Sequence, residues 1–450
     1  MSTVIIRSKL FGDMFASEAM QALYSDQALV QRYIDVEVAL AKAQGKLGVI
    51  PEDAAKVIAV SADISRVDWD RLSDRTRIVG YPILPLVEQM SDWAEGGLGQ
   101  YCHWGATTQD IMDTADVLQI RDALDLVEAE LKAICDAAAS LSEKHADTPM
   151  AGRTHLQQAL PITFGFKTAR WLFSLDRHLE RLSELRPRVL IGEFAGAAGT
   201  LASLGPDGIA VQKALMEELG LGQPGMPWHT ARDGFAETTG LLAMICGTLG
   251  KIGFDIMLMM QSEIGEVYEP FVSGRGASST MPQKRNPIAS ELMVAAAKTV
   301  RECHAAMLDG MVHDHERATG PKHVEWQALP TAFLLTSGAL AAAREALEGL
   351  EVNEKAMRRN LDATGGLIVA EAVMMGLAPE IGRQVAHDVV YDCCREALEK
   401  GEAFLDVIAR HPEIAGKIER KTLAQLVDPA NYLGSAPRMV DDYLKSRKAL

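Results

Sequence analysis

The chain has 450 residues, of which 48% are apolar, and it carries a formal net charge of −16 at pH 7. This length exceeds what one hydrophobic core normally supports, so we expect two or three domains. The acidic balance argues against nucleic acid and anionic membrane surfaces as partners. It leaves room for a small anionic substrate, because a pocket sets its own local field.

Six cysteines show no paired spacing typical of a metal site, so we expect free thiols in a reducing cytoplasm. The N-terminus lacks a charged segment followed by an apolar run and a small-residue cleavage site, which indicates no secretory signal. The most apolar stretch, 241–260, is interrupted by Lys251 and Asp255. We interpret it as a buried helix rather than a membrane span.

The first third of the chain predicts helices. Val30, Ile34 and Val38 recur at helical spacing. The pattern therefore predicts a helix that ends near Gly48 and a second one that begins at Pro51.

A polar segment, 102–110, comes next, and a long helix is predicted over 115–146. Thr107, Thr108 and Gln109 lie just before that helix. Their hydroxyl and amide groups can cap it, and its first N–H groups would then form an anion site. From the residues alone, capping and anion binding are both open.

The segment 152–161 is predicted to lead into another long helix and contains His155. A single histidine beside a helix start is more often structural than catalytic. Its role is therefore open at this point.

A helix is predicted over 234–264, and its apolar residues recur three and four positions apart. They are Leu241, Ile245, Leu249, Ile252, Ile256 and Met259. This spacing approaches the period of long packed bundles. We interpret the helix as the axis of a bundle that also assembles subunits.

The stretch 274–287 gathers small residues, adjacent serines, a lysine and an asparagine. Small residues permit unusual backbone angles, and Pro287 fits the first turn of a helix predicted over 288–307. We interpret the stretch as a mobile arm that delivers Ser278 and Ser279 to a site. The alternative is a surface linker with incidental serines.

The sequence SSTMPQKRNP at 278–287 resembles the signature of the fumarase/aspartase superfamily, GSSxMPxKxNP, with Ala277 in place of the leading glycine. The resemblance implies an all-α, three-domain fold whose central long-helix bundle assembles a homotetramer with shared active sites. It also implies cleavage of a bond β to a carboxylate in a small di- or tricarboxylate. The chemistry requires no cofactor or metal.

The same resemblance assigns roles within the arm. Ser278 is the expected general base, acting as an alkoxide in a desolvated, cationic pocket, and Ser279 is its competitor for that role. Lys284 and Asn286 are expected to hold carboxylates and to stabilise the charge that develops on the aci-carboxylate intermediate.

Two other segments resemble superfamily regions. Thr107, Thr108 and Gln109 begin a segment similar to the first region, which grips a substrate carboxylate. The sequence THLQ at 154–157 is similar to the second region, in which the histidine contacts substrate or takes part in acid/base work.

The second region implies further assignments around His155. Glu291 is expected to pair with His155 and orient its ring, and Arg153 is counted among the substrate-binding residues. Gln158 stands where adenylosuccinate lyases carry a second histidine.

The segment 313–317, HDHER, looks metal-like, but its spacing matches no zinc motif. It resembles the His-Glu-Arg segment of adenylosuccinate lyases and cycloisomerases, in which no metal is involved.

We divide the chain into an N-terminal helical domain (1–114), a central long-helix bundle (115–351) and a C-terminal helical domain (352–450). As function we favour a lyase that cleaves the C–N bond of an N-substituted aspartate and releases fumarate. The alternative is a 3-carboxy-cis,cis-muconate cycloisomerase. An adenylosuccinate lyase is less favoured because 75–84 lacks the histidine of that family. A structural or binding protein without activity is also less favoured, because the superfamily motifs are intact.

Overall fold

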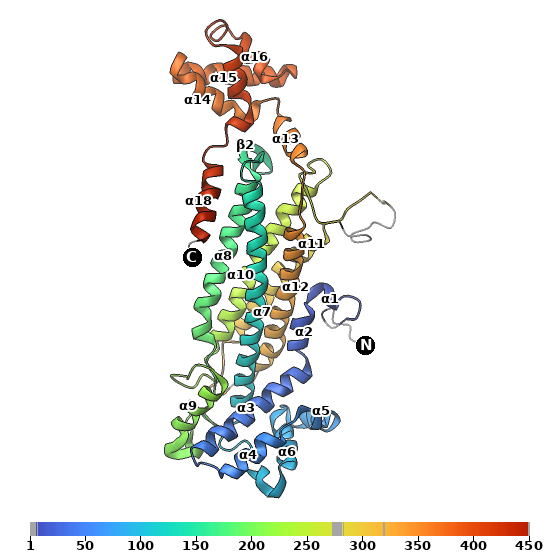
Figure 1. The fold of residues 1–450 in the computed structure, drawn as a ribbon, viewed down its shortest axis with the longest axis vertical. Coiled ribbons are helices and arrows are strands. Elements are labelled where there is room, and N and C mark those ends of the chain that lie inside the picture. The colour runs from blue at the N-terminus through green and yellow to red at the C-terminus, as the bar shows by residue number, and fades with distance from the viewer. Residues whose placement is uncertain (1–5, 7, 272–280, 282, 318–319, 449–450) are drawn as a thin grey trace. The chain divides into compact units, whose positions relative to one another are not determined.

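The computed structural model describes residues 6, 8–271, 281, 283–317 and 320–448 of the chain (Figure 1). Contacts between Cα atoms divide it into two compact units. Unit 1 comprises Met1–Leu131, Arg177–Leu249 and Leu292–Ala341, and unit 2 comprises Lys132–Asp176, Gly250–Glu291 and Ala342–Leu450. The division into three consecutive domains stays a prediction.

The predicted all-α class is confirmed, since the described strands are confined to two small two-stranded sheets. The α-helices are α1 (Gly12–Phe15), α2 (Glu18–Leu23), α3 (Asp26–Lys46), α4 (Glu52–Ser61), α5 (Trp69–Val79), α6 (Ile83–Trp93), α7 (Thr108–Lys144), α8 (Phe164–Val189), α9 (Gly208–Leu219), α10 (Asp233–Met260), α11 (Ile288–Asp309), α12 (Pro321–Glu348), α13 (Glu354–Asp362), α14 (Ala370–Ile381), α15 (Arg383–Lys400), α16 (Phe404–Arg410), α17 (Arg420–Val427) and α18 (Ala436–Lys448). The 3₁₀ helices are η2 (Ile64–Arg66), η3 (Glu95–Tyr101), η4 (Ala202–Asp207), η5 (Leu367–Val369) and η6 (Pro429–Asn431). The strands are β1 (Pro149–Thr154), β2 (Gln157–Thr163), β3 (Val267–Tyr268) and β4 (Glu351–Val352).

Helix α3 shows how local sequence builds unit 1. Ser25 caps its first turn, because its hydroxyl accepts a hydrogen bond from the Ala28 N–H at 3.1 Å. Val30 and Ile34 are buried, as their spacing predicts. Just after the helix, Gly48 adopts a φ of +71°, a conformation that favours glycine.

Helix α10 confirms the periodicity argument but is shorter than predicted, since it ends at Met260. The six apolar positions of its predicted stripe are all buried. Among the described residues, it is the one helix long and apolar enough by itself to cross a membrane, and half of that apolar window is buried inside the protein. A core helix of a folded domain passes the same test.

The segment around His155 differs from the prediction. Instead of leading directly into a helix, 149–163 forms an antiparallel hairpin in unit 2, with Thr154 paired to Gln157. His155 and Leu156 form its two-residue turn with φ values of +50° and +62°. Two successive positive φ angles are typical of a type I′ turn, which matches the twist of the flanking strands. His155 therefore lies at the exposed tip of a hairpin rather than beside a helix start.

Unit 2 also contains a helical cluster near the C-terminal end of the chain. Helices α14, α15 and α16 lie together (Figure 1), and α17 packs against α14 and α16. Their shared core includes Val373, Leu377, Val389, Phe404, Ile408 and Leu423.

Candidate active site

The predicted substrate residues of the first region lie at the N-terminal end of α7, in unit 1. Thr108 is the first residue of the helix. The hydroxyl of half-buried Thr107 accepts a hydrogen bond from Arg317 Nη1 at 2.6 Å. Gln109 is buried, and its side-chain amide donates to Asp113 Oδ2 at 3.0 Å and to the His229 carbonyl at 2.9 Å. The Gln109 amide therefore links two parts of unit 1, and its contact with substrate stays a prediction.

Asp110 is the anchor of this end of α7. Its fully buried carboxylate accepts from the backbone N–H groups of Thr107 (2.9 Å), Ala195 (3.0 Å) and Gly196 (3.0 Å). It also contacts His229 Nε2 at 2.7 Å. Asp110 therefore fixes both Thr107 and the turn at Gly196, where φ is +77°. The sequence analysis did not single out Asp110.

His229 and Glu193 complete a buried charged centre with Asp110. Burial opposes the charged form of His229, but the hydrogen bond to Asp110 and the nearby charge of Glu193 outweigh it, so the pKa of His229 is raised. Glu193 Oε1 lies 4.0 Å from His229 Nε2, and Glu193 Oε2 accepts from the Trp228 N–H. Burial raises the pKa of Glu193 to about 7.

The same three side chains are close enough to hold a metal ion, with ligand atoms within 4.8 Å of one another. However, both Asp110 oxygens already receive two hydrogen bonds each. A carboxylate satisfied in this way has little capacity left for a cation. We therefore interpret the group as a hydrogen-bonded centre that shapes the end of α7.

A second buried centre lies on the same helix, around Asp113. Arg232, which is fully buried, donates to Asp113 at 2.7 and 3.0 Å and to Glu325 at 2.7 and 2.6 Å. Lys322 contacts Asp113, Glu325 (3.1 Å) and Asp116 (3.2 Å). The two cations and the carboxylates of Asp113 and Glu325 balance, so this centre offers no spare positive charge to a substrate.

The pKa values in this centre follow from its geometry. Burial alone would raise the pKa of Asp113, but Arg232 and Lys322 hold it well below its usual range. Asp116 contacts Lys322 at 3.2 Å, and burial raises its pKa to about 6. The sequence analysis did not predict the pairing of Arg232 with Asp113, because no local pattern marks partners that are 119 positions apart.

Arg317 is the cation beside the predicted carboxylate-binding residues. Besides Thr107, its guanidinium donates to the carbonyls of Ala197 (2.5 Å) and Gly196 (3.4 Å). It is half-buried and comes from the HDHER segment. Unlike Arg232, Arg317 donates to neutral groups, a hydroxyl and two carbonyls. It therefore keeps a positive charge that a carboxylate can use.

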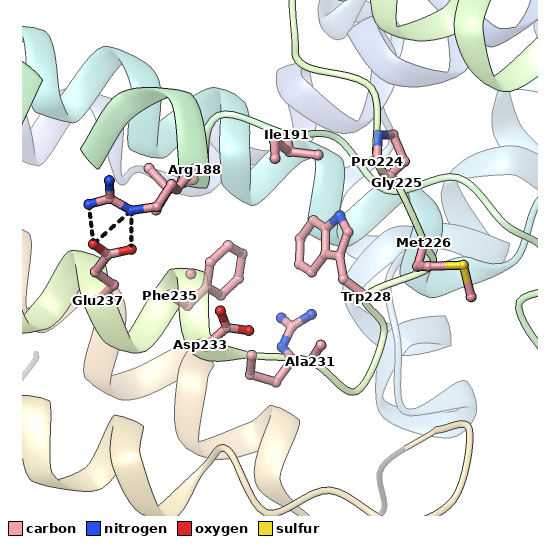
Figure 2. Close-up of a pocket in the computed structure, with 13 residues that line it drawn as sticks. Arg188, Ile191, Pro224, Gly225, Met226, Trp228, Ala231, Asp233, Phe235 and Glu237 are labelled. Carbon is pink, nitrogen blue, oxygen red and sulfur yellow. Dashed lines mark hydrogen bonds and ion pairs between the residues drawn. The ribbon is translucent and has the colours of Figure 1, made fainter. Parts of the chain in front are cut away.

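A small pocket of about 220 Å³ adjoins Arg232 in unit 1 (Figure 2). The Arg232 guanidinium lies over the rings of Trp228 (5.0 Å) and Phe235 (4.6 Å). Arg188 and Glu237 form an ion pair between exposed side chains of the same pocket (Figure 2). The pocket thus contains one buried arginine and one exposed arginine in different settings.

Unit 2 holds the predicted residues of the second region. Arg153 makes a bidentate ion pair with fully buried Glu266, at 2.8 and 2.7 Å. Asn360 also donates to Glu266 at 2.8 Å. The Arg153 guanidinium is thereby bound at the base of the hairpin, whereas His155 at its tip is exposed.

The described residues at the start of α11 and just before it, up to Glu291, belong to unit 2. Ser278 and Ser279 lie outside the described residues. Lys284 is exposed, Asn286 is half-buried, and Glu291 is exposed in the first turn of α11. Within the described part of the chain, no hydrogen bond or ion pair joins His155 to Glu291, so that pairing stays a prediction.

The start of α11 is held by a residue that the sequence did not single out. Buried Glu269 accepts from the N–H groups of Ala289 (3.1 Å) and Ser290 (2.8 Å) and from the Ser290 hydroxyl (2.6 Å). Nearby, Arg285 makes a bidentate pair with Glu351 at 2.9 and 2.8 Å. These contacts fix the chain on both sides of Asn286.

Comparison with known proteins finds similar sequences and structures over nearly the whole chain. The lyase family profile matches residues 13–301, and the profile of the adenylosuccinate lyase C-terminus matches residues 366–443. Trans-aconitate decarboxylase 1 of Mycosarcoma maydis is 49% identical over 96% of this chain and 88% of its own length. A fumarate lyase structure from Mesorhizobium sp. BNC1 is 52% identical, with a TM-score of 0.91 and coverage of 96% and 99%. The 3-carboxy-cis,cis-muconate lactonizing enzyme of Pseudomonas putida is 41% identical, with a TM-score of 0.94 and coverage of 98% and 99%.

These comparisons overturn the function that the sequence analysis favoured. Enzymes named 3-carboxy-cis,cis-muconate cycloisomerase recur among the relatives at 40 to 43% identity, and they support the alternative reading. The favoured cleavage of an N-substituted aspartate was wrong because it gave too much weight to the THLQ segment around His155. That segment resembles enzymes that release fumarate, but the similarity to cycloisomerases extends over nearly the whole chain.

Proposed function

Since the chain belongs to the lyase family of the fumarase/aspartase superfamily, in the branch of the cycloisomerases and adenylosuccinate lyases, we propose that it lactonises 3-carboxy-cis,cis-muconate. The observation that carries this proposal is the similarity to cycloisomerases over nearly the whole chain. Such coverage includes both units and the signature segment, so it is not confined to one shared motif.

The chemistry matches the residue types. A carboxylate oxygen of the substrate forms a C–O bond to an alkene carbon, and the neighbouring carbon gains one proton; no other atom enters or leaves. The carbanion character next to a carboxylate must be stabilised by hydrogen-bond donors and positive charge. We assign the proton transfer to Ser278, with Lys284 and Asn286 as carboxylate ligands.

We also propose a carboxylate-binding role for residues of unit 1. The N-terminal end of α7 favours an anion through the helix dipole. Arg317 lies there with its donors on Thr107 and on two carbonyls. We propose that a substrate carboxylate takes these donors, whereas Arg232 and Lys322 stay bound to their buried carboxylates.

The test is direct. The purified protein is incubated with 3-carboxy-cis,cis-muconate, and loss of the conjugated diene is followed by ultraviolet absorbance, with the lactone identified by NMR. We expect turnover by the native protein and its loss in Ser278→Ala. Turnover that persists in Ser278→Ala and is lost in Ser279→Ala would instead assign the proton transfer to Ser279. Absence of lactone with the native protein would contradict the proposal.

A second candidate function has its own support. The 49% identity to a trans-aconitate decarboxylase over 96% of the chain favours decarboxylation of an unsaturated tricarboxylate, in which a C–C bond breaks, CO₂ leaves and a proton replaces it. The two functions are separable, because decarboxylation releases CO₂ and lactonisation does not. Release of CO₂ from trans-aconitate, with no change in carboxymuconate, would favour this candidate.

We also propose a homotetramer. Helix α10 is largely apolar, yet Met244 and Phe254 on it are about half exposed, at 48% and 53%. Exposed apolar side chains on a long core helix are typical of an interface between subunits. Sedimentation analysis should show a tetramer, and Met244→Glu with Phe254→Glu should give smaller species.

A further inference from the structure

Unit 1 contains a cavity of about 530 Å³ that plays no part in the proposed reaction. Residues of α3, α7 and α12 line it, together with Tyr24 just after α2. Ligand pockets in proteins typically measure about 300 to 1,000 Å³. The cavity is therefore large enough for a small organic molecule.

Two of the residues that line this cavity carry a hydrogen-bond donor with no partner among the described residues. They are Tyr24, through its buried hydroxyl, and Trp326, through its buried Nε1. Unbonded buried polar groups are uncommon and costly, so each one calls for an explanation. Burial, followed by the charges of Asp116 and Asp122, raises the pKa of Tyr24 well above its ordinary value. The hydroxyl therefore stays protonated and able to donate.

Neighbouring contacts hold these two groups in place. The Tyr24 ring stacks on Phe333 with centroids 5.8 Å apart. The Trp326 ring makes edge contacts with Tyr81 at 5.6 Å and with His323 at 4.6 Å. Because packing fixes both rings, the Tyr24 hydroxyl and Trp326 Nε1 are held in defined positions.

The charges around the cavity select against an anion. Asp26, Asp116 and Glu325 contribute carboxylates to its lining, and the cation nearest to them, Lys322, is already bound to Asp116 and Glu325. The remaining lining is largely apolar, including Leu29, Met112, Leu329, Pro330 and Leu334. A di- or tricarboxylate is therefore the wrong chemistry for this space.

We propose that the cavity is a second binding site, for a neutral and mostly apolar small molecule whose carbonyl or ether oxygen accepts a hydrogen bond from Tyr24 or Trp326. The site goes beyond the proposed function, because its ligand class excludes the polyanionic substrate. Glu325 belongs both to the cavity wall and to the centre around Arg232. A ligand here would consequently contact the back of the charged network.

The test uses prodan, a neutral naphthalene ketone whose fluorescence shifts to the blue in apolar surroundings. With the native full-length protein we expect saturable binding. Tyr24→Phe removes one donor and should weaken binding roughly fivefold to tenfold, and Leu334→Trp should fill the space and weaken it by more. Tyr391→Phe and Val60→Trp, which change exposed residues, are the matched controls.

Three results would overturn the proposal: no saturable binding, equal binding by the native protein and the cavity variants, or displacement of prodan by carboxymuconate in direct competition. If Leu334→Trp fails to fold by circular dichroism, Tyr24→Phe and Trp326→Phe decide the outcome. The proposed function can fail in its own assay while prodan binding persists, so the two results are distinguishable.

Discussion

The charged residues that stand out in unit 1 and the predicted site residues of unit 2 differ in burial. In unit 1, Asp110 and Arg232 are buried, and several donors or acceptors bind each of them. In unit 2, three predicted site residues, His155, Lys284 and Glu291, are exposed. The difference separates residues that hold the fold from residues that remain available to a ligand or to another subunit.

The hairpin of unit 2 shows the same contrast within one element. Arg153 at its base is bound to buried Glu266, while His155 occupies the turn. A two-residue turn with positive φ at both positions is a rigid way to present a side chain. The hairpin is therefore anchored at its base by Arg153 and holds His155 exposed at its tip.

The largest expected effect comes from removing a buried charge in unit 1. Arg232→Met leaves the buried carboxylates of Asp113 and Glu325 with fewer partners. Removing one member of a buried ionic group typically costs about 3 to 5 kcal/mol. Urea unfolding at fixed protein concentration should show this loss.

The control for that experiment lies in the same pocket. Arg188→Met removes an exposed ion pair with Glu237 (Figure 2), and exposed pairs contribute little to stability. If the two variants unfolded at the same urea concentration, the contrast between bound and exposed charge would not hold.

A pH experiment tests a second buried group of unit 1, the carboxyl group of Glu193. The folded protein raises the pKa of Glu193 from its ordinary value of 4.5 to about 7, so the folded state holds this proton more tightly than the unfolded state. Stability from this group is present below pH 4.5 and falls as the pH rises towards 7. Glu193→Gln cannot ionise and should be more stable than the native protein at pH 8, by something on the order of 3 kcal/mol.

The unfolding midpoint at pH 4.5 and pH 8 measures this difference. Glu184→Gln, which changes an exposed carboxylate, should follow the native curve. A native-like decline for Glu193→Gln would show that other groups, such as Asp116 with its pKa of about 6, carry the pH dependence.

The sequence predicted well wherever the signal was local. The apolar stripe of α10 was found because helical periodicity repeats every few residues. The hairpin was missed because its turn, His155-Leu156, lacks the asparagine or glycine that usually marks a type I′ turn. The signature segment was recognised from ten consecutive residues, whereas the activity was not, since related enzymes share those residues.

The buried centres were not predictable in this way. Asp110 meets His229 and Gly196 from far along the chain, and Asp113 meets Arg232 in the same manner. Such pairs arise only when helices pack, so no window of sequence contains both partners. The site residues of unit 2 remain predictions that activity must test.

The next prediction concerns His155, an exposed residue of unit 2. His155→Asn keeps a residue that tolerates positive φ, so the hairpin and the stability should persist. If His155 takes part in acid/base work, kcat for the proposed substrate should fall by about 10²-fold or more. Gln157→Ala, which changes an exposed neighbour on β2, should keep native kcat. Unchanged turnover in His155→Asn would remove this histidine from the site.

The smallest expected effect concerns Thr107, which lies between the two classes because it is half-buried and bonded to Arg317. Thr107→Val keeps the shape and removes the hydroxyl that holds the guanidinium. If that hydroxyl positions Arg317 for a substrate carboxylate, KM should rise roughly fivefold to tenfold while kcat changes less, because a hydrogen bond to a charged group contributes about 1.5 kcal/mol or somewhat more. Thr299→Val, on the exposed face of α11, should leave both constants unchanged. A fall in stability with native KM would instead place Thr107 with Asp110, as part of the fold rather than of the site.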